Sequence, residues 1–270
     1  MIKNGAASLM VRLLHLPRAA PAPTYPRRHH HRHALLPSLR LRASAPVPSA
    51  AAMSSTAAAQ EVADQKRALR SEVRRALRAL TPEQRASEDQ AIQNAILNSS
   101  WFKESKRLCA YISCAQLREV DTSKVLSEVL SPNSEHGHAK DLYVPRVEDK
   151  NRNMRMLKIT TMDDLVKNSM NILEPSPLDA SGNAREEGQA FDRTGRRLGR
   201  GGGYYDTFLM RYQELAKEKG WDQPLLVALS YSVQIMEEGI IPVNSTDVPI
   251  DALVSSSGII PISPAALARI

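Results

Sequence analysis

A glycine-rich segment that leads directly into an amphipathic helix most constrains the fold of this chain. Residues 199–203 contain four glycines, and a helical stripe of apolar residues follows until Gly220. The next apolar runs, Leu225–Leu229 and Ile250–Val254, have the composition of strands that are buried on both faces. Strands alternating with helices in this way predict a layered α/β/α domain with a mixed or mostly parallel central sheet.

The chain upstream of the glycines shows the same alternation of elements. Thr81-Pro82-Glu83-Gln84 has the pattern of a helix start, with a capping hydroxyl, a first-turn proline and a glutamine. We expect helices over residues 60–80, 82–97 and 122–130. We expect strands over residues 107–113, 141–144 and 154–159, the second of them ended by Pro145.

The first 60 residues differ from the rest of the chain in charge. They contain eight basic residues and no acidic residue. The remaining residues include 28 basic and 29 acidic side chains, so the total net charge of +7 belongs to the N-terminal segment. A nearly neutral domain argues against nucleic-acid binding by the folded part.

The N-terminal segment has the composition of an organelle transit peptide, because it is rich in Arg, Ala and Ser and free of acids. We expect residues 1–59 to be disordered and to direct the protein to the mitochondrion. A plastid address, a basic tail without an address, and cytosolic protein initiated at Met53 stay open. The domain is expected over residues 60–262, with a C-terminal tail at 263–270.

Two further counts limit the class of protein. No apolar run approaches the roughly 20 residues that a membrane helix needs, so we expect no membrane partner. The chain has two cysteines, Cys109 and Cys114. This number excludes a disulfide-built fold, and we expect both side chains to be reduced thiols.

The segment around the glycines has the chemistry of a phosphate cradle. Its glycines allow backbone N–H groups to approach a ligand, and the N-terminus of the following helix favours an anion. Arg196, Arg197 and Arg200 add positive charge. The pattern of a P-loop is absent. Two other interpretations are a flexible Gly/Arg turn and an RNA-binding segment in which Tyr204 and Tyr205 stack on bases.

The whole string is more specific than its glycines. Residues 191–206 read FDRTGRRLGRGGGYYD, which closely resembles the signature of the 5-formyltetrahydrofolate cyclo-ligase (methenyltetrahydrofolate synthetase) family, especially its plant members. Further blocks resemble the family in the same order, over about residues 62–262: KRALR at 66–70, SCAQLREVDT at 113–122, YVPR at 143–146, NILEP at 171–175 and IPVNSTDVPID at 241–251.

The resemblance implies an ATP site and a folate site. The implied ATP-binding residues are Lys66, Arg70, Arg197, Leu198, Gly199, Arg200, Gly201, Gly202, Gly203, Tyr204 and Tyr205. The implied folate-binding residues are Ile112, Glu119, Arg200 and Tyr204. Arg200 and Tyr204 are the expected catalytic residues, and Arg200 would neutralise charge on the transferred phosphoryl group. The implied Mg²⁺ ligands are Asp206 and Asp247, with Asp251 as the alternative second carboxylate.

The family's reaction is the ATP- and Mg²⁺-dependent cyclisation of 5-formyltetrahydrofolate to 5,10-methenyltetrahydrofolate, with release of ADP and phosphate. The resemblance therefore implies a ligase of folate one-carbon metabolism. Its small-molecule partners would be ATP and 5-formyltetrahydrofolate. We expect a monomer without a nucleic-acid partner.

The chain departs from the family pattern just before the signature. The family has an apolar strand ahead of the glycine loop, whereas residues 181–191 read SGNAREEGQAF here and leave no room for it. One central strand of the sheet therefore looks absent. A catalytically impaired splice or gene-model variant of the family is the first alternative function. An RNA-binding protein that uses the Arg/Gly/Tyr segment is the second.

Overall fold

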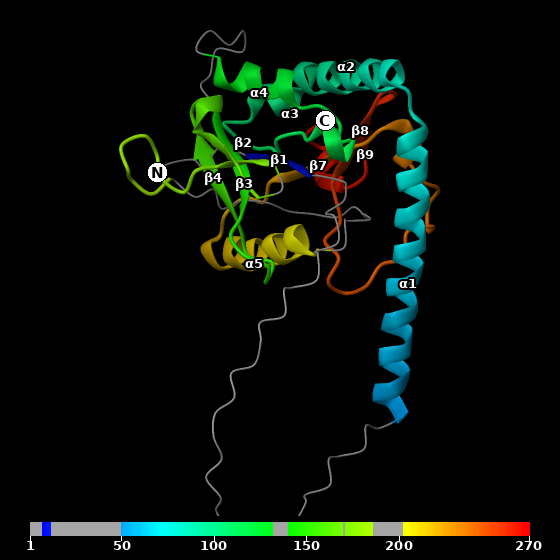
Figure 1. The fold of residues 1–270 in the computed structure, drawn as a ribbon. Helices are drawn as coiled ribbons and strands as arrows, with labels where there is room; N and C mark the ends of the chain where they lie inside the picture. Colours follow the sequence, from blue (N-terminus) through cyan, green and yellow to red (C-terminus); the bar gives the residue numbers. More distant parts are fainter. Residues whose placement is uncertain (1–6, 12–49, 132–139, 170, 186–201) are drawn as a thin grey trace, which may run out of the picture.

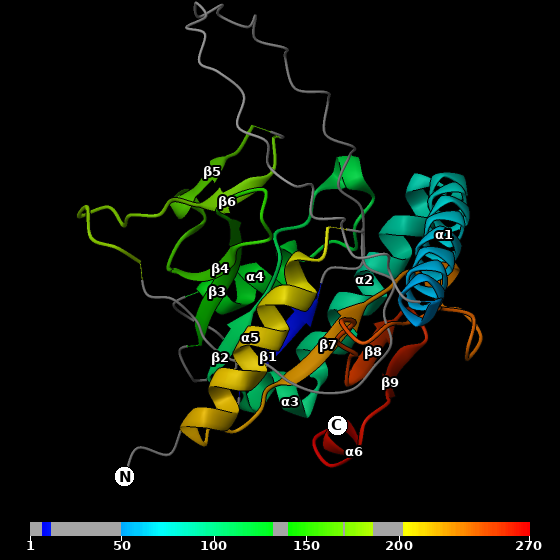
Figure 2. The ribbon, with the colours of Figure 1, turned by 90° about the horizontal axis from the view of Figure 1, so that it is seen from below.

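The computed structural model describes residues 7–11, 50–131, 140–169, 171–185 and 202–270. A seven-stranded sheet with the order β4-β3-β2-β1-β7-β8-β9 forms the centre (Figures 1 and 2). Its inner pairs are parallel, and the edge pairs β3–β4 and β8–β9 are antiparallel. This arrangement confirms the predicted mixed α/β class. The strands are β1 (Ala7–Val11), β2 (Arg107–Cys109), β3 (Asp141–Val147), β4 (Met154–Ile159), β7 (Leu225–Leu229), β8 (Ala252–Ser255) and β9 (Gly258–Pro261).

The remaining elements surround this sheet. A separate two-stranded sheet pairs β5 (Leu165–Lys167) with β6 (Leu173–Pro175). The helices are α1 (Ala50–Ala79), α2 (Pro82–Asn98), α3 (Ser100–Glu104), α4 (Ser123–Leu130), α5 (Tyr204–Lys219) and α6 (Pro264–Leu267), with short 3₁₀ helices at Ala115–Leu117, Met162–Asp164 and Ser232–Gln234. Each described helix is too short or too polar to cross a bilayer.

Alternate residues of β7 contact two different helical layers, as the period of a strand requires. Leu225 and Val227 belong to the core cluster that contains α2, α3 and α4, whereas Leu226 and Ala228 belong to the cluster that contains α5. Figure 1 shows these helices on opposite faces of the sheet, with the long α1 upright along one side. The observed layers are those of the predicted α/β/α sandwich.

The sheet contains a strand that we did not expect. β1, formed by Ala7–Val11, lies between β2 and β7 and pairs in parallel with both. We expected no strand in the N-terminal segment, because it lacks sustained strand periodicity. We also expected the first helix of the domain from about residue 60, but α1 begins at Ala50. A strand of five residues is too short to show a sustained period, so periodicity does not predict it.

The predicted start of the second helix is confirmed in atomic detail. The Thr81 hydroxyl accepts a hydrogen bond from Gln84 N at 3.2 Å, and Gln84 Oε1 accepts one from Thr81 N at 2.9 Å. This reciprocal pair is a capping box. Gly220 ends α5 in the left-handed region, with φ of 64°.

The strand predicted to stop at Pro145 continues to Val147. The carbonyl of Tyr143 accepts a hydrogen bond from Ala110 N at 2.9 Å, so the backbone N–H and C=O groups of Tyr143 point toward β2. The same groups of every second residue along β3 point the same way, and position 145 is one of them. β2 ends at Cys109, so the position opposite Pro145 lies beyond the end of β2. The absence of an N–H group on Pro145 therefore removes no hydrogen bond between the two strands.

Substitution of Asp164 by asparagine should remove part of the acid sensitivity of this fold. Burial raises the pKa of Asp164, but N–H groups of Thr160 and Thr161 and the Arg185 guanidinium, 2.8 Å away, lower it to about 2 from 3.8. A lowered pKa stabilises the fold above pH 3.8, and that contribution is lost as the pH falls toward about 2. The difference in melting temperature between wild type and Asp164→Asn should therefore shrink over this range. A difference that is independent of pH would contradict it.

Candidate active site

The N-terminus of α5 forms one wall of the candidate site. Gly203 precedes the helix with φ of 71°, a conformation that favours glycine. Asp206 lies in the first turn of the helix, and its Oδ1 accepts a hydrogen bond from Val248 N at 3.1 Å. This contact joins the helix to the loop before β8.

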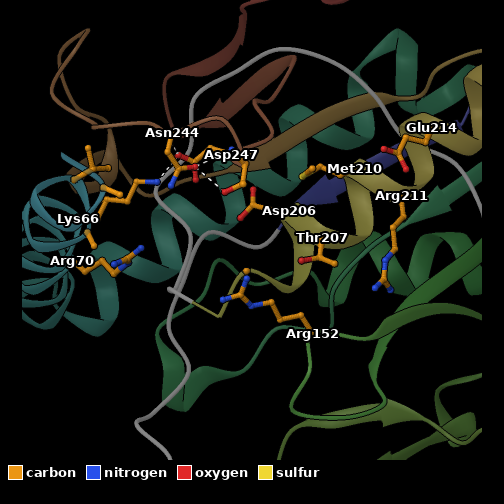
Figure 3. A pocket seen from close by; sticks show the side chains of 15 residues that line it. Lys66, Arg70, Arg152, Asp206, Thr207, Met210, Arg211, Glu214, Asn244 and Asp247 are labelled. Atoms are coloured by element: carbon orange, nitrogen blue, oxygen red, sulfur yellow. Dashed lines mark hydrogen bonds and ion pairs between the residues drawn. The ribbon is translucent and has the colours of Figure 1, made fainter. Parts of the chain in front are cut away.

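That loop carries the second predicted carboxylate. Asp247 Oδ2 accepts a hydrogen bond from Asn244 N at 2.8 Å and forms an ion pair with Lys66 Nζ of α1 (Figure 3). Lys66 is 7% exposed. A lysine so deeply buried needs a partner for its charge, and Asp247 provides it. The ion pair links segments that are 181 residues apart in the chain.

The start of α5, the loop before β8 and one side of α1 line a single cavity of about 580 Å³. This volume lies within the range of pockets that hold small ligands. The charged residues that line it are Lys66, Arg70, Arg152, Asp206, Arg211, Glu214 and Asp247. Figure 3 shows Asp206 and Asp247 next to each other, with Lys66 and Arg70 extending from α1 on the opposite side. Cations and carboxylates that line one cavity suit a ligand with both phosphates and a metal ion.

Burial lowers the pKa of Arg70, and the carboxylate of Asp247 opposes this effect. An arginine remains protonated in proteins. Arg70 therefore offers a partly desolvated positive charge in the cavity, where an anion interacts with it more strongly than in bulk water.

Arg152 is a lining residue that the sequence prediction missed. It lies in the turn between β3 and β4 with φ of 69°, an uncommon conformation for a side-chain-bearing residue. A Cβ atom built on Gly203 would lie 3.3 Å from Cζ of Arg152, so the guanidinium packs directly over the glycine. In the sequence, Arg152 stands out only as a basic residue in a polar segment. Its proximity to Gly203 follows from the pairing of β3 with β4 and from the position of α5.

Other predicted site residues are not among those that line this cavity. Ile112 is buried, and Glu119 is 4% exposed and accepts a hydrogen bond from Cys114 N at 2.9 Å. The Tyr204 hydroxyl donates to the carbonyl of Asp149 at 3.1 Å. Tyr205, in the first turn of α5, is partly buried against the core cluster that contains Leu209 and Tyr212. Gly202 adjoins the start of α5, and Arg197, Leu198, Gly199, Arg200 and Gly201 lie outside the described residues.

The carboxylates of the site fit a magnesium ion that is bound together with phosphates. The Asp247 carboxylate accepts from Lys66 and from Asn244 N through Oδ2. Asp206 lines the same cavity. The described residues contain no group of three His, Cys, Asp or Glu side chains close enough to hold a metal without other ligands. Mg²⁺ commonly takes one or two carboxylates and completes its shell with phosphate oxygens and water, so the donor set is suitable.

Gly203→Ala should disturb both the helix start and Arg152. An alanine at φ of 71° is strained, and its Cβ would require the Arg152 guanidinium to move. We expect the free energy of unfolding to fall by about 1 kcal/mol, and the affinity for ATP, the ligand that the resemblance implies, to fall as well. Chemical denaturation and nucleotide titration check this, with Gly239→Ala as the control. Gly239 has φ of 84° but open space around its Cβ position, so its affinity for ATP should stay unchanged.

Comparison with known proteins shows the family of this chain. A family model described as the 5-formyltetrahydrofolate cyclo-ligase family matches residues 62–256. That span includes Lys66, Arg70, Asp206 and Asp247. The chain belongs to this cyclo-ligase family. The predicted resemblance is therefore confirmed.

Individual relatives extend this result. The chain is 59% identical to the mitochondrial 5-formyltetrahydrofolate cyclo-ligase of Arabidopsis thaliana, over 80% of this chain and 84% of the relative. It is 30% identical to the mouse 5-formyltetrahydrofolate cyclo-ligase, over 72% and 95%. The solved structure of 5,10-methenyltetrahydrofolate synthetase from Aquifex aeolicus matches with a TM-score of 0.53 and 24% identity, over 74% of this chain and 92% of that one. This last similarity supports the cyclo-ligase fold.

Proposed function

We propose that this chain catalyses the ATP-dependent cyclisation of 5-formyltetrahydrofolate to 5,10-methenyltetrahydrofolate, with release of ADP and phosphate. One observation carries the proposal: Lys66 and Arg70 of α1, Asp206 of α5 and Asp247 before β8 line one cavity. These are residues that the family resemblance assigns to phosphate and magnesium. Membership of the cyclo-ligase family supplies the reaction.

The proposed mechanism activates the formyl group by phosphorylation. The formyl oxygen attacks the γ-phosphorus of ATP, ADP leaves, and an imidate phosphate forms. N10 then attacks the formyl carbon and loses its proton, the C–O bond breaks, and inorganic phosphate departs with the former formyl oxygen. An amide oxygen is a poor leaving group, so its transfer to phosphate makes the ring closure possible.

The protein contributes alignment and neutralisation of charge. Lys66, Arg70 and Arg152 would contact the phosphates, and the N–H groups at the start of α5 would donate hydrogen bonds to an anionic oxygen. Asp206 and Asp247 would hold Mg²⁺, which neutralises phosphate charge. Arg200 and Tyr204 remain our proposed catalytic residues, and Ile112 and Glu119 our proposed folate contacts.

A turnover assay on the purified full chain tests the function. Methenyl product, followed by its near-ultraviolet absorbance, should form only when 5-formyltetrahydrofolate, ATP and Mg²⁺ are all present. Asp206→Asn should abolish most of the rate while the melting temperature of the free protein changes little. A folded protein that binds ATP but forms no product would instead support the catalytically impaired variant.

We also propose that residues 1–59 direct the protein to the mitochondrion. The segment is basic and free of acids, and the name of the Arabidopsis relative includes a mitochondrial location. A fluorescent reporter fused behind residues 1–59 should enter mitochondria of plant cells. Accumulation in plastids or in the cytosol would contradict this proposal without affecting the enzymatic one.

A further inference from the structure

The central position of the sheet is filled by a strand from the N-terminal segment. β1 forms a parallel ladder with β2 through Ala7–Leu9 and with β7 through Ser8–Val11. In Figure 2 it lies between these two strands, inside the sheet and away from its edges. Residues 12–49 separate it from α1, a length of chain that imposes little restriction on where the strand lies.

The neighbours of β1 need a strand at this position. All five residues of β7 are buried, and its other side pairs with β8. Without β1, strands β2 and β7 would lie roughly 10 Å apart, which is two strand spacings and too far for a hydrogen bond. Buried N–H and C=O groups on both strands would then lose their partners, and native proteins rarely tolerate this.

The composition of the segment fits this place. Asn4–Val11 is the longest stretch without charge or proline in residues 1–48. Lys3 and Arg12 are the charged residues next to it on either side. Uncharged and largely apolar residues suit a strand covered on both faces, whereas proline could not donate to the ladder.

We propose that Ala7–Val11 is an obligatory strand of the folded domain, held in a strand-binding groove between β2 and β7, and that it stays with the domain after any processing of the N-terminal segment. Residues 1–59 then act first in targeting, before the chain folds, and afterwards in the structure of the folded domain. A targeting signal is recognised on the unfolded chain, and the strand enters the sheet on folding. Cleavage after residue 11 would leave the fragment bound in the groove.

Hydrogen exchange of the full chain tests this placement directly. Backbone amides of Ser8–Val11 should exchange at least about 100-fold more slowly than in a free peptide of the same sequence. Exchange of these amides at the free-peptide rate, with β7 protected, would overturn the proposal.

Two variants of the full chain separate the strand from the rest of the segment. Leu9 pairs with both Cys109 and Leu226, so Leu9→Pro should lower the melting temperature by about 10 °C or abolish a cooperative transition. Leu36→Pro, also in residues 1–59, should leave it unchanged. Equal melting temperatures for all three proteins would overturn the proposal.

A cleavage experiment tests retention without any change to the strand. A specific protease site placed at residues 22–28 allows the folded chain to be cut behind the strand. The N-terminal fragment should coelute with the domain in gel filtration, and Leu9→Pro should release it. Complete release of the wild-type fragment, with an unchanged melting temperature of the remaining domain, would show that the groove needs no such strand.

Discussion

Asp247→Asn is expected to reduce turnover by on the order of 100-fold, the size seen when one group that stabilises developing charge is removed, and to destabilise the protein. The stability effect arises because Lys66 is 7% exposed and pairs with Asp247. A neutral side chain at position 247 would leave a buried ammonium without its counter-charge. We expect the free energy of unfolding to fall by about 3 kcal/mol.

A double variant separates the two effects of this substitution. Lys66→Met combined with Asp247→Asn removes the uncompensated charge, so it should regain much of the lost stability. Its turnover should stay low, because the proposed magnesium carboxylate and the proposed phosphate-binding cation are both gone. Asp222→Asn, at an exposed position, serves as the matched control and should behave like wild type. Normal turnover of Asp247→Asn would show that the reaction does not need the Asp247 carboxylate.

Asp251→Ala is expected to produce a large loss of stability. Asp251 is fully buried; its Oδ2 accepts from Leu226 N at 2.8 Å and its Oδ1 from the Ser263 hydroxyl at 2.5 Å. Both donors are buried too, and alanine would leave them without these acceptors. At about 1–3 kcal/mol for each unsatisfied group, we expect a loss of about 3 kcal/mol, which corresponds to a melting temperature about 10 °C lower.

The conservative variant Asp251→Asn keeps a carbonyl oxygen for one of the two donors and should lose less stability. Calorimetry of both variants beside Asp222→Ala measures the difference. If Asp251→Ala has the same melting temperature as wild type, the hydrogen bonds of Asp251 are not needed to hold β7 against the C-terminal segment. These contacts give Asp251 a structural role, which is consistent with our proposal of Asp247 as the second magnesium carboxylate.

Local chemistry made several elements predictable. The capping box at Thr81 and the C-terminal glycine at position 220 depend on neighbouring residues, so the sequence contains all the information that they need. β7 was predictable from its continuous apolar run. The family resemblance added Lys66, Arg70, Asp206 and Asp247, which the structure brings to one cavity.

Other features depend on contacts between distant segments and could not be predicted. A basic helix face gives no indication that Lys66 is buried against Asp247, 181 residues away. Arg152 contacts Gly203 only because the β3–β4 turn meets the start of α5. β1 was missed since its five residues lie in a segment whose composition indicates targeting, and since the partners that stabilise it are β2 and β7.

Isotope transfer tests the central claim most directly. The full chain would receive MgATP and 5-formyltetrahydrofolate that carries ¹⁸O in its formyl group. Our account predicts equal amounts of ADP and methenyl product, with the label in the released inorganic phosphate. Cleavage of ATP without label in the phosphate, or no product from a folded chain, would contradict the proposed cyclo-ligase mechanism for this protein.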